Sequence, residues 1–108
     1  MVIDEQTLNE RIEDYVADVR RDMPIDCVYL FGSYANGTPS EWSDIDLCFF
    51  SSDTASQRTV DMTVRLLELA CKYNPEVCFE PHCFHTSEPE NDNPFVKEVL
   101  RTGRKISL

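Results

Sequence analysis

Apolar side chains recur at helical spacing over residues 7–23, so this stretch is predicted to form an amphipathic helix. Thr7, followed three residues later by Glu10, has the spacing of a capping box, and Pro24 ends the segment. The repeating apolar residues are Leu8, Ile12, Tyr15, Val16, Val19 and Met23. One face of this helix is therefore expected to pack on the rest of the protein.

Two further helices are predicted downstream. The first spans residues 53–74, carries an apolar stripe and stops before Pro75. The second begins at Asn93, which can cap it, with Pro94 in the first helical position. Gly103 stands where the residue after a helix is commonly glycine. The stripe of the first of these helices consists of Val60, Val64, Leu67 and Cys71.

Three short apolar runs are predicted to be β-strands, over residues 27–31, 44–50 and 76–84. In the second run, alternation places Asp44 and Asp46 on one face of the strand, together with Cys48. The opposite face carries Ile45, Leu47 and Phe49. The second strand thus combines an apolar face with a face that begins with two acids.

The order of these elements predicts the fold class. A short helical turn is expected at residues 33–37, between the first two strands. Pro81, late in the third strand, indicates an edge position or a bulge, since proline cannot donate a backbone hydrogen bond. The resulting order is helix, strand, short helix, strand, helix, strand, helix. We therefore expect an α+β fold, a small α/β sandwich with helices against a short sheet, formed by residues 1–108 as a single domain.

The composition is that of a globular domain, because 42% of the 108 residues are apolar. No apolar run approaches the roughly 20 residues of a membrane-spanning helix, and the acidic, amphipathic N-terminal segment does not resemble a signal peptide. The five cysteines are an odd number without a CxxC pair, which favours reduced thiols and a cytoplasmic location.

The formal net charge is −10, which argues against a sequence-independent grip on nucleic acid, because such binding needs Lys and Arg on the phosphates. Between Arg21 and Arg58 the sequence contains no Lys or Arg. Any chemistry in that stretch must therefore proceed without a local basic side chain.

Gly32 and Ser33 follow the first predicted strand and precede the predicted helical turn. Glycine allows the backbone to approach a ligand closely, and a helix start offers unpaired N–H groups that suit a phosphate. A Gly-Ser pair at a turn is also common without any ligand, so a plain turn is the alternative.

Asp44 and Asp46 would repel each other on one strand face unless a cation such as Mg²⁺ or Mn²⁺ lay between them. The alternative is a solvated strand end with two exposed acids. A third acid is available on the third strand, where Glu76 and Glu80 share a face. We favour Glu80, because an acid in mid-strand is costly unless it is exposed or used, whereas Glu76 beside Pro75 is easily solvated.

The spacing of these residues resembles a known motif. Gly32-Ser33, ten intervening residues and then Asp44-x-Asp46 match the GS-x10-DxD pattern of the DNA polymerase β-like nucleotidyltransferase superfamily. The stretch "GSYANGTPSEWSDIDL" is similar to its small stand-alone members, the minimal nucleotidyltransferases. The later segments "EPHCF" and "DNPFVKEVLRTG" extend the resemblance over nearly the whole chain.

The resemblance implies a mixed β-sheet flanked by helices and transfer of a nucleoside monophosphate, expected to be AMP from ATP, to a hydroxyl acceptor. Gly32 and Ser33 would contact the triphosphate, and Asp44 and Asp46 would bind Mg²⁺ or Mn²⁺. The third acid of the superfamily is usually Asp; here its best match is Glu80, which would bind metal or help deprotonate the acceptor. Minimal members of the superfamily often occur as antitoxins beside a helical HEPN-domain protein, which they adenylylate in characterised pairs. The resemblance therefore implies a HEPN-type partner, or a second copy of the chain.

Three alternatives stay open at the level of sequence. The chain could be a catalytically weak module that binds a nucleotide or a partner. It could also modify a small molecule, although relatives that do so carry an additional acceptor domain. The cluster Cys78, His82, Cys83 and His85 could bind zinc, but its spacing matches no common zinc motif, and packing or exposure explains it better. Cys27, Cys48 and Cys71 are expected to be small core residues.

Overall fold

A computed structural model describes residues 4–32, 44–52, 56–74, 77–86 and 93–108. The short helical turn expected at 33–37 lies outside the described residues, as do Ser33 and Glu76. In chain order the elements are α1 (Glu5–Asp22), β1 (Cys27–Phe31), β2 (Ile45–Ser51), α3 (Ser56–Ala70), the 3-10 turn η1 (Cys71–Tyr73), β3 (Phe79–His85), α4 (Pro94–Thr102) and β4 (Arg104–Lys105).

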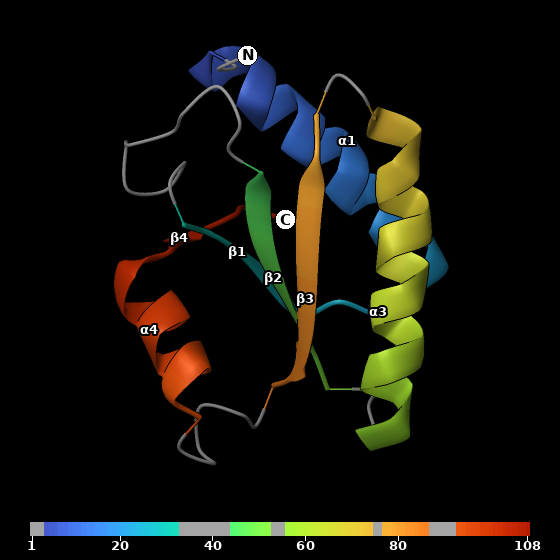
Figure 1. Ribbon diagram of the computed structural model, residues 1–108, viewed down its shortest axis with the longest axis vertical. Coiled ribbons are helices and arrows are strands. Elements are labelled where there is room, and N and C mark those ends of the chain that lie inside the picture. The colour runs from blue at the N-terminus through green and yellow to red at the C-terminus, as the bar shows by residue number, and fades with distance from the viewer. Residues whose placement is uncertain (1–3, 33–43, 53–55, 75–76, 87–92) are drawn as a thin grey trace.

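The strands form one mixed sheet in the order β3-β2-β1-β4 (Figure 1). β1 is antiparallel to both β2 and β4, whereas β2 and β3 are parallel. The parallel pair is joined through α3, because parallel neighbours need a crossover connection. The predicted α+β fold with helices against a short mixed sheet is therefore confirmed.

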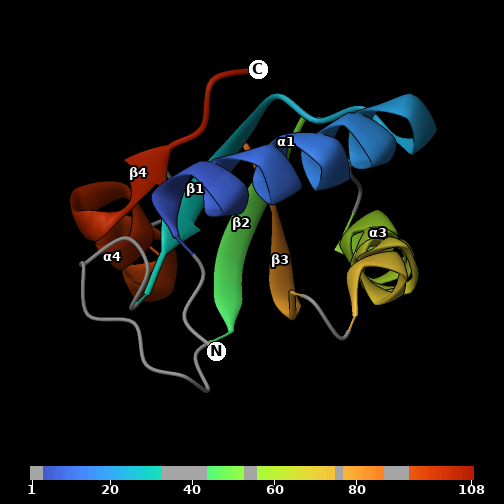
Figure 2. The ribbon, with the colours of Figure 1, turned by 90° about the horizontal axis from the view of Figure 1, so that it is seen from above.

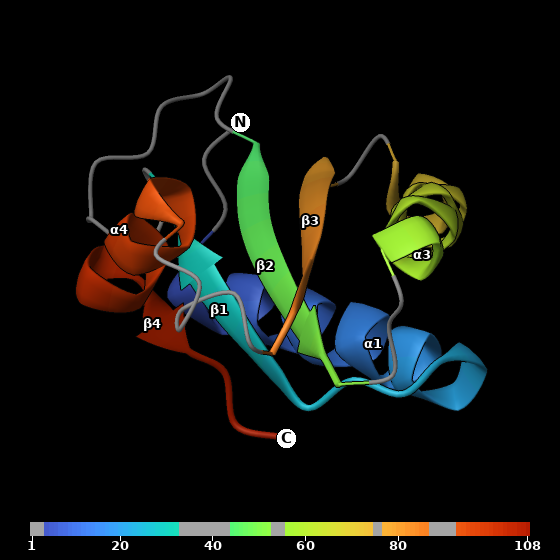
Figure 3. The ribbon, with the colours of Figure 1, turned by 90° about the horizontal axis from the view of Figure 1, so that it is seen from below.

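The helices lie on both faces of the sheet (Figures 2 and 3). Side chains of α1 and α3 form one apolar cluster with Val28, Leu30, Ile45, Leu47, Phe49 and Phe79 of the strands. On the other face, Val96 and Val99 of α4 pack with Cys48 and Phe50. The alternation predicted for the second strand is thus confirmed, because its odd and even positions enter different clusters.

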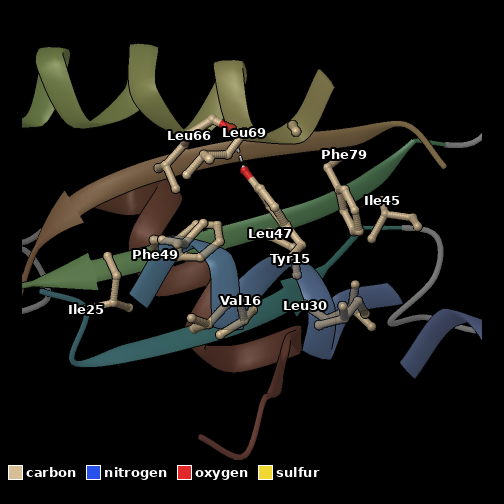
Figure 4. Close-up of a cluster of buried hydrophobic side chains, with 14 of the residues drawn as sticks. Tyr15, Val16, Ile25, Leu30, Ile45, Leu47, Phe49, Leu66, Leu69 and Phe79 are labelled. Atoms are coloured by element: carbon tan, nitrogen blue, oxygen red, sulfur yellow. Dashed lines mark hydrogen bonds between the residues drawn. The ribbon is translucent and has the colours of Figure 1, made fainter. Parts of the chain in front are cut away.

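Tyr15 stands at the centre of the larger cluster (Figure 4). Its ring stacks on Phe79 with centroids 4.4 Å apart and meets the edge of Phe49 at 5.8 Å. Its hydroxyl donates a 2.7 Å hydrogen bond to the carbonyl oxygen of Leu66 in α3. The buried phenol is therefore satisfied, and it connects α1, α3 and the sheet.

Helix α1 confirms the predicted helix and its buried stripe, but the predicted start is wrong. The N-cap is Asp4, whose side chain accepts a 2.8 Å hydrogen bond from the backbone N–H of Thr7. Thr7 lies inside the helix because Asp4 supplies the capping acceptor three residues earlier. The helix ends with Met23 as its C-cap, directly before Pro24.

Helix α3 turns its predicted apolar stripe to solvent. Val60, Val64 and Leu67 are 65%, 52% and 48% exposed, and Cys71 is exposed as well. The face that packs on the sheet consists of Met62, Leu66, Leu69 and Ala70. The expectation that Cys71 is a core residue is therefore wrong. Two apolar stripes with helical spacing coexist on this helix, and periodicity alone does not say which one is buried.

The remaining elements largely match their predictions. β3 is an edge strand, a position that tolerates Pro81, although it starts at Phe79 rather than at residue 76. Asn93 caps α4 with Pro94 in its first turn, and Gly103 follows the helix in an extended conformation. A Cβ on Gly103 would lie 2.5 Å from the carbonyl oxygen of Val99, so close packing excludes a side chain there. β4 was not predicted.

Candidate active site

Two acids meet where β2 and β3 begin. Asp46 and Glu80 are the second residues of their strands, and the parallel register pairs them directly. On the other side of β2, the register pairs Asp46 with Phe31, the last residue of β1. Since β1 is antiparallel to β2, its C-terminal end meets the N-terminal ends of β2 and β3 at one end of the sheet. This juxtaposition brings together Asp46 of the motif and Glu80, the acid predicted as the third metal ligand.

The Asp46 carboxyl group is electrostatically unusual. It is half-buried, and its pKa is raised to about 7, chiefly because burial penalises the charged form. A hydrogen bond with the Glu80 carboxylate and the negative charges of Glu80 and Asp44 raise the Asp46 pKa further. Without a cation the pair is therefore stabilised by keeping a proton. A divalent ion would replace that proton and allow both groups to be charged.

His82 completes this cluster. One donor atom each from Asp46, Glu80 and His82 lie within 4.8 Å of one another. His82 follows Glu80 by two residues on β3, so strand alternation puts both on the same face. The sequence predicts a different grouping, of His82 with Cys78, Cys83 and His85. That grouping is wrong for Cys83, which is buried in the cluster on the opposite face.

Asp44 lies just before β2 and is exposed. The Cys78 thiol hydrogen-bonds to its carboxylate, and burial together with this contact raises the pKa of Cys78. The charge of Asp44 contributes to the raised pKa of Asp46, so the two carboxylates interact electrostatically. Asp44 nevertheless stands beside the compact group of Asp46, Glu80 and His82 rather than within it.

Gly32 connects the two halves of the sequence motif. Its backbone has a positive φ of 76°, a conformation that L side chains rarely adopt. A Cβ at this position would lie only 2.3 Å from Oδ2 of Asp46. The glycine is therefore required both by its own conformation and by the carboxylate packed against it.

The donor set suits a divalent cation. Asp46 and Glu80 supply carboxylate oxygens, which Mg²⁺ and Mn²⁺ bind, and their mutual repulsion requires a counter-charge. The charged groups that act on the pKa of Asp46 are the acids Glu80 and Asp44, and no Lys or Arg is among them. The residues present thus fit the metal that a site of this kind would need.

A separate hollow lies between α1 and the C-terminal segment. Its volume is about 220 Å³, and its lining is Asn9, Ile12, Glu13, Arg104, Lys105, Ile106 and Ser107. None of the acids or the histidine of the cluster contributes to it. Arg104, the largest cation in its wall, already contacts Asn9 and Glu5. The acidic cluster, and not this hollow, is therefore the candidate active site.

The family of this chain is shown by its sequence as a whole. The sequence profile of the family described as "Polymerase beta, Nucleotidyltransferase" matches residues 10–107, and the chain belongs to that family. Membership supports transferase activity and confirms the DNA polymerase β-like superfamily expected from the Gly-Ser and Asp-x-Asp motif. The match extends over nearly the whole chain.

Comparison with solved structures supports the fold. A crystal structure of a protein classed as a nucleotidyltransferase superposes with a TM-score of 0.54. The two sequences are 21% identical, and the alignment covers 91% of this chain and 96% of the other. No curated protein matches the sequence. Within the part of the chain that the structure describes, no helix is long and apolar enough to cross a membrane.

Proposed function

We propose that the chain is a divalent-metal-dependent nucleotidyltransferase that moves AMP from ATP to a hydroxyl group on a partner protein. The observation that carries the proposal is the register of β2 and β3, which pairs Asp46 with Glu80, together with the packing of Gly32 against Asp46. Gly32, Asp46 and Glu80 are separated in the sequence but lie together in the fold. The chain that carries them belongs to the nucleotidyltransferase family.

Each motif residue has a distinct role in this proposal. Asp44, Asp46 and Glu80 hold Mg²⁺ or Mn²⁺, and Gly32 and Ser33 contact the triphosphate through backbone N–H groups and the serine hydroxyl. The ion would supply the positive charge that neutralises the phosphate oxygens, since the segment from 22 to 57 contains no Lys or Arg. Glu80 is exposed, so it can also accept the proton of the acceptor hydroxyl.

The proposed acceptor is a helical partner of the HEPN type, with the chain acting as its antitoxin; a second copy is the other candidate. The exposed apolar side chains of α3 support a protein acceptor, because contiguous apolar surface commonly marks a contact site. The five cysteines are free thiols in the structure, which supports a reducing, cytoplasmic compartment.

The direct test is incubation with α-labelled ATP and Mg²⁺ or Mn²⁺, with and without the product of the neighbouring gene. We expect label on the partner and release of pyrophosphate. The Asp44→Asn/Asp46→Asn variant should lose both, whereas Asp61→Asn, an exposed acid on α3, should retain them. Equal labelling by the site variant and the wild type would contradict the proposal.

A second candidate is a domain that binds a nucleotide or a partner without useful catalysis. It is favoured by the third acid, because an exposed Glu80 replaces the usual Asp, and by the lack of basic residues near the motif. Calorimetry with metal and ATP, beside a pyrophosphate assay with all four nucleotides, distinguishes the two candidates. Tight binding without pyrophosphate release would support the binding module.

A further inference from the structure

We infer that His82 is a nitrogen ligand of the ion held by Asp46 and Glu80, and that this ligand makes the site select Mn²⁺ over Mg²⁺. The inference rests on the metal site of the proposed function and deepens it, since it names a further ligand and the preferred ion. A histidine is not part of the Gly-Ser and Asp-x-Asp motif, and it comes from this chain's own third strand.

The geometry allows the three side chains to share one ion. Their donor atoms lie within 4.8 Å of one another, and Nε2 of His82 is 3.9 Å from Oε1 of Glu80. Two ligands on one ion at metal–ligand distances of about 2.1 Å are separated by about 3 Å when adjacent and about 4.2 Å when opposite. Small side-chain rotations would therefore bring all three donors into coordination range.

The His82 ring is held in place by two aromatic neighbours. Its centroid lies 5.5 Å from that of Phe31, at the end of β1, and 5.5 Å from that of Phe95, in α4. Phe31 and Phe95 also contact each other edge to face. A ring fixed in this way loses little conformational entropy on binding an ion, which favours its use as a ligand.

The main alternative is an ion pair between His82 and Glu80. Their separation of 3.9 Å is longer than a hydrogen bond, and the two side chains are 33% and 53% exposed, so such a pair would contribute little. A shared ion accounts better for the arrangement, because it uses the histidine and also relieves the repulsion between Asp46 and Glu80.

The preference for Mn²⁺ over Mg²⁺ follows from the combination of carboxylate and imidazole ligands. Mg²⁺ binds oxygen ligands and retains several waters, whereas imidazole nitrogen suits first-row transition ions. Mn²⁺ accepts carboxylates and imidazole together, so the set of Asp46, Glu80 and His82 matches it better than Mg²⁺. Removing the nitrogen should therefore weaken Mn²⁺ binding more than Mg²⁺ binding.

The first test is pulsed electron paramagnetic resonance of Mn²⁺ bound to the protein, with ¹⁵N-labelled histidine as the isotope control. The chain has two histidines, so a nitrogen coupling can be assigned by substituting each. We expect the coupling in wild type and in His85→Gln, and its loss in His82→Gln and His82→Phe. The phenylalanine variant keeps an aromatic ring between Phe31 and Phe95, which guards against misfolding.

The second test is calorimetric titration of metal-free protein with Mn²⁺ and with Mg²⁺. His82→Gln should weaken Mn²⁺ binding at least about tenfold and change Mg²⁺ binding much less. His82→Asp, which makes the site all-carboxylate, should lower the Mn²⁺/Mg²⁺ affinity ratio below that of wild type.

The outcomes separate this inference from the proposed function. Bound Mn²⁺ without a histidine coupling, or equal losses for both ions in His82→Gln, would overturn the role of His82 and leave nucleotide transfer intact. Absence of Mn²⁺ binding to wild type would overturn the inference, and absence of both Mn²⁺ and Mg²⁺ binding would also remove the metal from the proposed function. Label transfer in the ATP assay is scored independently of both titrations.

Discussion

The Asp46 carboxylate occupies the space that a side chain at position 32 would need, because a Cβ there would lie 2.3 Å from Oδ2 of Asp46. A side chain at position 32 would have to adopt a positive φ and would also displace the Asp46 carboxylate. Glycine at position 32 is therefore compatible both with this backbone conformation and with the position of the Asp46 carboxylate.

Gly32→Ala is expected to strain the backbone by about 1–2 kcal/mol and to weaken divalent-ion binding by moving Asp46. Gly103→Ala is the matched control, because its Cβ would crowd the carbonyl oxygens of Val99 and Leu30 and not the Asp46 carboxylate. It should lower stability but leave ion affinity of the folded protein unchanged. Urea unfolding and ion titration measure the two effects. Wild-type ion affinity in Gly32→Ala would contradict the assigned contact.

Because its pKa is raised, Asp46 makes the folded protein less stable as the pH rises. Its pKa rises from an ordinary 3.8 to about 7 in the folded protein. Between these values the folded state binds more protons than the unfolded state, so Asp46 lowers the free energy of unfolding as pH rises from about 4 to about 7.

In the presence of EDTA, Asp46→Asn should therefore be more stable than wild type above about pH 7, and the difference should vanish near about pH 4. Acids with lowered pKa values, such as Asp18 and Asp26, are present in both proteins and cancel in the difference. Urea unfolding at a series of pH values gives the measurement. A stability difference that does not change with pH would show that the Asp46 pKa is not raised.

At the scale of the element, α3 carries apolar residues on two faces, and only one of them is buried. Leu66 is fully buried, whereas its neighbour Leu67 is 48% exposed. The carbonyl oxygen of Leu66 also accepts the Tyr15 hydroxyl, so this face of α3 is joined to α1 by packing and by a hydrogen bond. The buried face is therefore set by contacts with other elements.

This assignment predicts different effects for two adjacent leucines. Leu66→Ala should cost about 2–5 kcal/mol, because it removes buried contacts and leaves a cavity. Leu67→Ala should cost less than about 1 kcal/mol in the isolated chain, since much of that side chain is already in water. Both values come from urea unfolding with far-ultraviolet circular dichroism. Similar losses for the two variants would mean that the buried face of α3 has been assigned wrongly.

At the scale of the whole molecule, excess negative charge acts against the compact state. The chain has 20 acidic and 10 basic residues. Its radius of gyration is 13.3 Å, so these charges are close to one another. The Debye length is about 30 Å at 0.01 M salt and about 8 Å at 0.15 M, so the charges repel across the molecule only at low salt. Surface ion pairs such as Arg65 with Asp22 are screened as well, but each contributes little.

Raising NaCl from about 0.01 M to about 0.15 M with EDTA present should therefore raise the melting temperature. Neutralising exposed acids that lie outside the site, as in Glu13→Gln with Asp61→Asn, should reduce this salt response. Differential scanning calorimetry provides the comparison. A melting temperature that falls with salt would show that attractive ion pairs outweigh the net repulsion.

Local patterns in the sequence were enough to predict most helices and strands of this protein and their order. The apolar face of α1, the five residues of β1, the capped start of α4 and the α+β order follow from periodicity and capping chemistry, which act between residues close in the chain. The spacing of Gly32, Asp44 and Asp46 also predicted the family, which the family match confirms.

Only the tertiary structure decided which distant residues meet. The parallel register of β2 and β3 pairs Asp46 with Glu80 and brings His82 to them, while packing against α1 and the sheet decides which face of α3 is buried. β4 consists only of Arg104 and Lys105, so it is too short to show the apolar–polar alternation of a strand. It forms because it pairs antiparallel with β1. Periodicity indicates that a strand or helix has two faces, but the choice between them depends on the free energy of contacts that form only in the folded chain.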